Sequence, residues 1–185
     1  FVRRRAPDRD AARRRLGLKP NDRCYLFLGR LSQEKGADTL GVVQAELQKA
    51  SAAARLYVAG GGPLAHGVDA MEDVRLLGRR DDPEAVLIAA DVLLMPSRRE
   101  GLPMVALEAA ALGVPVAAFA VGGLADQGLA LTVPVDDVRS LVQAALHAVR
   151  DRAGRAAALD RSAAALKRLS PQAHAQALLA AYAPA

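Results

Sequence analysis

The chain has 185 residues and a formal net charge of +5, and 52% of its residues are hydrophobic although only 3% are aromatic. This length suits one well-cored domain and is short for two full nucleotide-binding domains. The composition excludes a disordered chain and favours an α/β core of alanine, valine and leucine. The single cysteine, Cys24, excludes an intramolecular disulfide, so a reducing, cytoplasmic setting is expected.

The chain begins with a basic stretch. Seven arginines stand at positions 3, 4, 5, 9, 13, 14 and 15. We expect residues 1–20 to form a linker or basic helix with a solvated arginine face, and Phe1 in place of a methionine suggests that the sequence is part of a longer protein. Binding of a polyanion stays open, because basic clusters attract nucleic acids and acidic lipids. Specific nucleic-acid binding is not expected, because the interleaved aromatic residues that single-strand binders stack on bases are missing.

Short apolar runs then alternate with amphipathic stretches. The runs predict buried strands bounded by Gly or Pro at 24–28, 55–59, 74–77, 92–95 and 114–118, and a further strand at 129–133. Helices are expected between them at 37–50, 82–90 and 103–112, and after them at 138–150, 156–169 and 172–182. This order predicts right-handed βαβ crossovers. The fold class is therefore α/β, with a Rossmann-like parallel sheet flanked by helices, a core in residues 21–150 and C-terminal helices in 151–185. No segment is apolar over the length that a membrane span needs, and no signal peptide is evident.

The turn after the first strand, GRLSQEKG, carries two cations. Ligands of such sheets lie at the carboxyl ends of the strands. Gly29 permits close approach of the backbone, while Arg30 and Lys35 suit a diphosphate, since arginine grips phosphate with a planar fork and lysine acts as a point charge. Two surface cations on a loop remain the alternative. The glycine run at 60–62 could form a turn whose backbone approaches a ligand, but alone it is weak evidence for a binding site.

The segment EGLPMVALE at 100–108 places two carboxylates at the start of a helix. Pro103 suits the first helical position and Gly113 a helix end, and the N–H groups of a helix N-terminus form an anion site. Glu100 falls in the loop, while Glu108 lies ~7 to 8 Å farther along the helix. The two carboxylates are therefore expected to reach different parts of one elongated ligand. Burial of an unpaired carboxylate costs free energy, so Glu108 is expected either to face water or to meet a polar partner.

Taken together, these segments resemble a known family. GRL…EKG, VAGGGPL, LLGRRDD, ADVLLMPS and EGLPMVALEAAALGVPV…GG are similar to the donor-binding domain of retaining GT-B glycosyltransferases, family 4 (glycosyl transferases group 1) in particular, from about residue 14 to residue 150. The resemblance implies the C-terminal half of a GT-B fold, a single nucleotide-sugar-binding domain over residues 1–185. It implies transfer of a sugar, hexosyltransferase-like, from a nucleotide diphosphate sugar to an acceptor hydroxyl. The N-terminal acceptor domain of such enzymes is absent, so the fragment alone is expected to be inactive.

The resemblance also implies roles for individual residues. Arg30 and Lys35 would hold the diphosphate of the donor, Glu100 would contact sugar hydroxyls, and these three form the catalytic set. Glu108 would contact the ribose hydroxyls. The donor-binding set is completed by Gly29, Arg79, Gly101, Leu102, Pro103, Met104 and Val105, of which residues 101 to 105 would offer backbone amides to phosphate and sugar. The family often has a glutamate after the glycine pair at 122–123, where this chain has Leu-Ala-Asp.

The expected partners are a nucleotide diphosphate sugar and the missing N-terminal domain. A peripheral position at the inner face of the membrane, reached through that domain, stays open. No cofactor or metal is expected, because the three histidines are scattered and lack the spacing of a zinc site. The motifs of phosphate-binding ATPase loops and nicotinamide-dinucleotide sites are missing. Two alternatives remain: a non-catalytic nucleotide-binding or interaction module of the same fold, and a polyanion-binding module.

Overall fold

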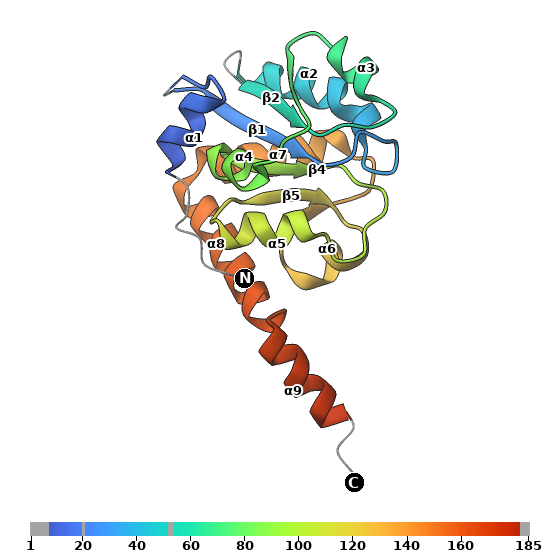
Figure 1. The fold of residues 1–185 in the computed structure, drawn as a ribbon, viewed down its shortest axis with the longest axis vertical. Helices are drawn as coiled ribbons and strands as arrows, with labels where there is room; N and C mark the ends of the chain where they lie inside the picture. The colour runs from blue at the N-terminus through green and yellow to red at the C-terminus, as the bar shows by residue number, and fades with distance from the viewer. Residues whose placement is uncertain (1–7, 20, 52–53, 182–185) are drawn as a thin grey trace.

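The computed structural model describes residues 8–19, 21–51 and 54–181. At its centre is a six-stranded sheet with the order β3-β2-β1-β4-β5-β6, in which every neighbouring pair is parallel (Figure 1). The strands are β1 Arg23–Leu28, β2 Ala54–Ala59, β3 Val74–Gly78, β4 Val92–Met95, β5 Val116–Phe119 and β6 Leu131–Val133. The predicted α/β class and parallel sheet are confirmed. β5 begins two residues later than expected, after Pro115, which has no N–H to give to a ladder of hydrogen bonds.

The helices connect the strands and follow the sheet. They are α1 Arg9–Arg15, the 3₁₀ helix η1 Ala37–Thr39, α2 Leu40–Ala50, α3 Ala65–Asp69, α4 Pro83–Ala89, α5 Met104–Ala111, α6 Gly122–Gln127, α7 Val138–Arg150, α8 Arg152–Arg168 and α9 Pro171–Ala181. α8 starts four residues before its predicted position because the Asp151 carboxylate caps it by accepting from the Ala153 amide. α3 and α6 are not predicted by the sequence. Across the described ranges, no helix combines the length and the apolar character needed to cross a bilayer.

Two apolar layers cover the sheet. Alternate residues of each strand point to opposite faces, so that Leu26 packs with α1, α4, α5 and α8, while Phe27 packs with α2, α3 and α7. The four inner strands, β1, β2, β4 and β5, are buried on both faces, which explains why they appear in the sequence as continuous apolar runs. α9 continues from α8 and projects away from the body of the molecule (Figure 1).

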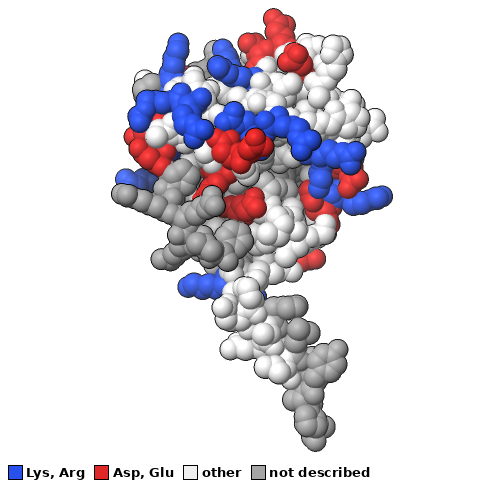
Figure 2. Space-filling view, viewed as in Figure 1, with Lys and Arg blue, Asp and Glu red and all other residues white. Residues whose placement is uncertain are grey.

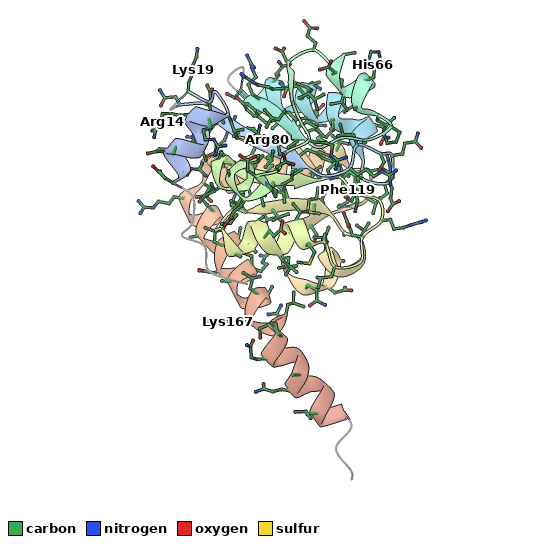
Figure 3. The ribbon with its side chains drawn as sticks, in the orientation of Figure 1. Arg14, Lys19, His66, Arg80, Phe119 and Lys167 are labelled. Atoms are coloured by element: carbon green, nitrogen blue, oxygen red, sulfur yellow. The ribbon has the colours of Figure 1, made fainter. Side chains whose placement is uncertain are left out.

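The arginines of α1 depart from the predicted solvated face. Arg13 is buried and Arg9 partly buried, and both pair with Asp91, at 3.4 Å and 2.9 Å. The Asp91 carboxylate also accepts from the Cys24 amide at 2.8 Å. Arg14 is exposed and points away from the sheet (Figure 3). A solvated basic helix is therefore wrong for Arg9 and Arg13, whose guanidinium groups fasten α1 to the amino-terminal end of β4; arginines 3 to 5 lie outside the described residues.

Candidate functional site

The candidate site lies where the strand order reverses. β1 and β4 are neighbours in the sheet although β2 and β3 come between them in the chain. Helical connections leave this point in opposite directions, which opens a crevice at the carboxyl ends of the strands. Two clefts occupy the crevice, one of about 480 Å³ and one of about 170 Å³, and both are bordered by Leu28 and Gly29 at the end of β1. On the face shown in Figure 2, a band of Lys and Arg side chains reaches the edge at which β4 and β5 end.

Glycines form the floor of the larger cleft. It is lined by Leu28, Gly29, Arg30, Gly60, Gly61, Gly62, Arg79 and Arg80. A Cβ atom on Gly60 would lie 1.8 Å from the Gly29 carbonyl oxygen, and φ at Gly60 is 145°. Only glycine fits there, because the turns after β1 and β2 touch backbone to backbone. The glycine run that is weak evidence in the sequence is thus required by the close approach of two turns.

Three arginines surround this cleft, and they differ in their partners. Arg80 donates to both carboxylate oxygens of Asp82, at 2.9 Å and 3.0 Å. The exposed side chains of Arg30 and Arg79 make no hydrogen bond or ion pair with the described residues. The structure therefore leaves Arg30 and Arg79, both predicted site residues, able to bind an anion.

The smaller cleft brings together two predicted catalytic residues. Lys35 Nζ donates to Glu100 Oε2 at 2.8 Å, although 65 positions separate them in the sequence. The Glu100 side chain is only 6% exposed and that of Lys35 is 31% exposed. The cleft is lined by Phe27, Leu28, Gly29, Lys35, Leu94, Met95, Ser97, Glu100, Pro103, Met104 and Val105. Its apolar wall comes from strand ends, and its charged wall is the Lys35–Glu100 pair.

Three glycine contacts hold the loops of this cleft in position. Gly36 has a φ of 73°, and a Cβ atom there would lie 2.0 Å from the Pro96 carbonyl oxygen. On the opposite side, the Gly123 amide donates to the Gly101 carbonyl at 2.8 Å. A Cβ atom on Gly122, where φ is 47°, would lie 1.9 Å from the carbonyl oxygen of Glu100. The glycine pair therefore supports the backbone at Glu100 and Gly101, a role that the sequence does not reveal.

The N-terminus of α5 faces the smaller cleft. α5 begins at Met104, with Pro103 as the N-cap, one residue later than the predicted start. No side chain caps it, and the Met104 and Val105 amides have no acceptor among the described residues. Such amides and the positive end of the helix dipole favour an anion. The predicted residues Gly101 and Leu102 are exposed and line neither cleft.

Glu108 lies one turn beyond this N-terminus. Its carboxylate is partly buried, and no hydrogen bond or ion pair within the described ranges involves it. Burial, and then the charge of Glu84 on α4, raise the pKa of this carboxyl. Glu108 does not line either cleft. Of the two expectations for this residue, the structure supplies no polar protein partner, so a contact with water or with a ligand is left.

Two further residues at the site escape prediction from the sequence. Ser97 is buried and lines the smaller cleft two residues after the end of β4, and the Pro-Ser pair that ends the apolar run is its signal in the sequence. Arg80 follows Arg79 in the turn after β3 and lines the larger cleft. Among the residues described, no group of three or more His, Cys, Asp or Glu side chains is placed to share a metal ion. His66 lies exposed on α3, at the periphery of the molecule (Figure 3).

This geometry defines a class of protein. A parallel sheet with helices on both faces, with cations and an uncapped helix N-terminus at its switch point, is a Rossmann-like α/β domain. The model of the family "Glycosyl transferases group 1" matches residues 22–151, and the chain belongs to this family. The resemblance to glycosyl transferases group 1 is confirmed.

The chain is similar in sequence to curated glycosyltransferases and in fold to several solved structures. The D-inositol 3-phosphate glycosyltransferase of Segniliparus rotundus is 38% identical over 135 residues, which cover 65% of this chain and 30% of that protein. Sucrose-phosphate synthase from Thermosynechococcus elongatus superposes with a TM-score of 0.75 at 26% identity, over 94% of this chain and 48% of that one. Anabaena HepE, solved in complex with UDP-glucose, shares the fold with a TM-score of 0.76 at 21% identity, over 93% of this chain and 52% of that one. The fold is that of GT-B glycosyltransferases, and the chain spans less than a third of the curated relative.

Proposed function

We propose that this chain is the donor-binding domain of a retaining glycosyltransferase. As part of a longer protein, it would transfer a sugar from a nucleotide diphosphate sugar to an acceptor hydroxyl, with the acceptor bound by a domain outside this sequence. One observation carries the proposal: Lys35, Glu100 and the uncapped N-terminus of α5 meet in a single cleft at the switch point. Membership of the glycosyl transferases group 1 supports it.

The predicted site residues have separate parts in the proposed complex. Lys35, the amides of Met104 and Val105, and Arg30 from the adjoining cleft would hold the diphosphate. Gly29 permits its approach to β1, and Arg79 adds a second cation in the larger cleft. Glu100 would accept hydrogen bonds from the sugar. Glu108, which has no protein partner in the described part of the chain, would accept from the ribose.

The proposed chemistry is stabilisation of a leaving group. The bond between the anomeric carbon and the β-phosphate oxygen breaks, and the anomeric carbon bonds to the acceptor oxygen with retention of configuration. The nucleoside diphosphate leaves with the electron pair of the broken bond and, directly or through solvent, with the acceptor's proton. Negative charge develops on its β-phosphate. Preorganised cations and amides aimed at such charge are usually the largest contribution to catalysis. We assign this role to Lys35, whose ammonium group pairs with Glu100 at the cleft.

Calorimetric titration of the 185-residue chain tests the proposal. UDP and UDP-glucose are suitable probes, because HepE, which shares the fold, was solved with them. GDP and ADP serve as the alternative bases. We expect binding of at least one nucleoside diphosphate and no transfer of sugar to an acceptor. Failure to bind any of them, or robust transfer by the purified chain, would contradict the proposal.

Binding is expected not to require a divalent metal. In the proposed complex, positive charge and donors for the diphosphate would come from Arg30, Lys35 and the α5 N-terminus. The measurement is the same titration after treatment with EDTA and after addition of Mg²⁺. Equal affinities are expected, whereas binding that is abolished by the chelator and restored by magnesium would show that the cations of the chain are insufficient.

Glu108→Gln and Glu100→Gln are expected to have different effects. The first keeps the shape of the side chain but weakens charge-assisted bonds to the ribose, which contribute on the order of 1.5 to 3 kcal/mol. We expect roughly tenfold to hundredfold weaker binding of both UDP and UDP-glucose. Glu100→Gln frees Lys35 from its carboxylate partner. It is therefore expected to leave UDP binding unchanged or tighter and to weaken only UDP-glucose.

Thermal melts provide an independent measurement on Glu108→Gln. Because burial raises its pKa, the neutral form of Glu108 is the one that favours folding. Its contribution is fully present below the unfolded-state pKa of about 4.3 and is lost as pH rises through the folded-state pKa. The glutamine variant should therefore match the wild type near that pH and melt slightly higher at neutral pH. Glu72→Gln, at an exposed position, is the matched control. In the titrations, equal losses of affinity for UDP and UDP-glucose in both Glu108→Gln and Glu100→Gln would contradict the separate roles proposed for these two residues.

A further inference from the structure

Arg98 joins three loops at the edge of the smaller cleft. Its Nη1 donates to Asp38 Oδ1 at 2.8 Å and to the Gln33 carbonyl at 2.9 Å, and its Nε donates to Asp136 Oδ1 at 2.7 Å. Its own backbone amide donates to the Glu34 carbonyl at 2.9 Å. One side chain therefore links the loop after β1, the loop after β4 and the turn before α7.

These bonds anchor the positions next to the charged pair of the cleft. Gln33 and Glu34 immediately precede Lys35, and Arg98 lies two residues before Glu100. The hydrogen bond from Arg98 lowers the pKa of Asp38, so the carboxylate of this contact stays ionised in mildly acidic solution. Arg98 does not line either cleft. Its side chain bonds to Gln33, Asp38 and Asp136, next to the loops that carry Lys35 and Glu100.

The geometry of this cluster requires an arginine. A guanidinium presents several donors in a rigid plane, whereas an ammonium offers one point from which bonds diverge. Three acceptors, two from the stretch after β1 and one from the turn before α7, surround Arg98. Asp136 is held there with a φ of 63°, a left-handed conformation that few residues other than glycine adopt. A lysine at position 98 would keep the charge but could not hold all three acceptors.

We propose that Arg98 is a positioning residue of the donor site, which fixes the separation of the Lys35 and Glu100 loops so that the two side chains can divide between diphosphate and sugar. The inference rests on the proposed function, since it names what holds that site in shape. Arg98 acts through these loops and does not contact the donor.

The test is a matched pair of charge-conserving variants, Arg98→Lys and Arg99→Lys. Arg99 is the next residue, is exposed and makes no side-chain bond with the residues described. We expect Arg98→Lys to bind UDP about tenfold more weakly, which corresponds to about 1.4 kcal/mol. The affinity for UDP-glucose should fall more than the affinity for UDP, because UDP-glucose is proposed to contact both Lys35 and Glu100. Arg99→Lys should leave both affinities unchanged. Because neither variant changes the net charge, long-range attraction of the anion is the same in both.

Amide hydrogen exchange separates positioning from a loss of overall stability. In Arg98→Lys, exchange is expected to quicken in residues 32–38 and 97–101 while the core strands stay protected. Asp136→Asn, which removes the negative charge of one exposed acceptor, should give a smaller loss of UDP affinity, about threefold. It also serves as the test if Arg98→Lys fails to fold. Unchanged UDP and UDP-glucose affinities in a folded Arg98→Lys, or in Asp136→Asn if that variant is needed, would overturn the inference on Arg98 alone. A wild-type chain that binds no nucleoside diphosphate would overturn the proposed function and this inference with it.

Discussion

Asp91→Asn is expected to lower the free energy of unfolding by about 3 kcal/mol or more. The carboxylate of Asp91 faces the guanidinium groups of Arg9 and Arg13 and accepts from the Cys24 amide. Arg13 is 8% exposed, so the variant leaves a buried cation without its counter-charge. Removal of one partner from a buried pair is much more costly than the pair's net contribution, because the other charge remains desolvated.

Urea unfolding of matched variants measures this effect. Asp160→Asn, on an exposed position of α8, is the control and should change the free energy of unfolding by less than about 0.5 kcal/mol. Arg13→Gln combined with Asp91→Asn should cost less than the sum of the two single variants, because the pair acts as a unit. If Asp91→Asn and Asp160→Asn unfold at the same urea concentration, the Asp91 cluster does not hold α1 to the sheet.

Lys35→Met is expected to weaken UDP binding by about a hundredfold, or about 2.7 kcal/mol. Two effects add. The variant loses the cation proposed for the diphosphate, and it leaves Glu100, 6% exposed, as an unpaired carboxylate in the same cleft. That negative charge opposes a second anion, and its repulsion is stronger in a partly buried cleft than in bulk water.

A second-site variant separates the two effects. Lys35→Met with Glu100→Gln lacks both charges, so it should bind UDP more tightly than Lys35→Met alone yet more weakly than the wild type. Lys49→Met on α2 removes an exposed lysine whose partner is Glu46 and should leave affinity unchanged. Calorimetry with UDP on all four proteins is the measurement. Wild-type affinity in Lys35→Met would exclude this residue from the diphosphate site.

Local sequence patterns predict most of the fold. Where the structure differs from these predictions, the difference has a physical cause. Strands buried on both faces are continuous apolar runs, so their positions are readable from the sequence. α3 has five residues and contains Gly67, and α6 opens with two glycines, so neither carries a helical period long enough to predict. Arg9 was expected on a solvated face because its partner Asp91 lies 82 residues away in the chain. No local pattern reports such a pairing.

The sequence predicts which residues gather at the site better than it predicts the contacts among them. Arg30, Lys35 and Glu100 follow strand ends, and parallel topology gathers such positions at one edge. The ion pair between Lys35 and Glu100 was not expected, because the resemblance assigns one to phosphate and the other to sugar. Its formation depends on how two loops pack, through Gly36 on one side and the Gly122–Gly123 pair on the other. The roles of all predicted site residues stay predictions until ligand binding is measured.

The central place of β1 has a consequence for the order in which the chain folds. β1 pairs with β2 over six residues, across a short stretch of chain, but its other edge waits for β4, whose residue Val92 stands beside Tyr25. Parallel pairing across so long a connection requires closure of a large loop, and the entropy of closure is lost before the strands gain any stabilising contact. We therefore expect β1, β2 and β3 to associate first and the half of the sheet that begins with β4 to join later. Until it does, one edge of β1 exposes unpaired amides and carbonyls, and a nascent chain is most open to pairing with the wrong strand during that interval.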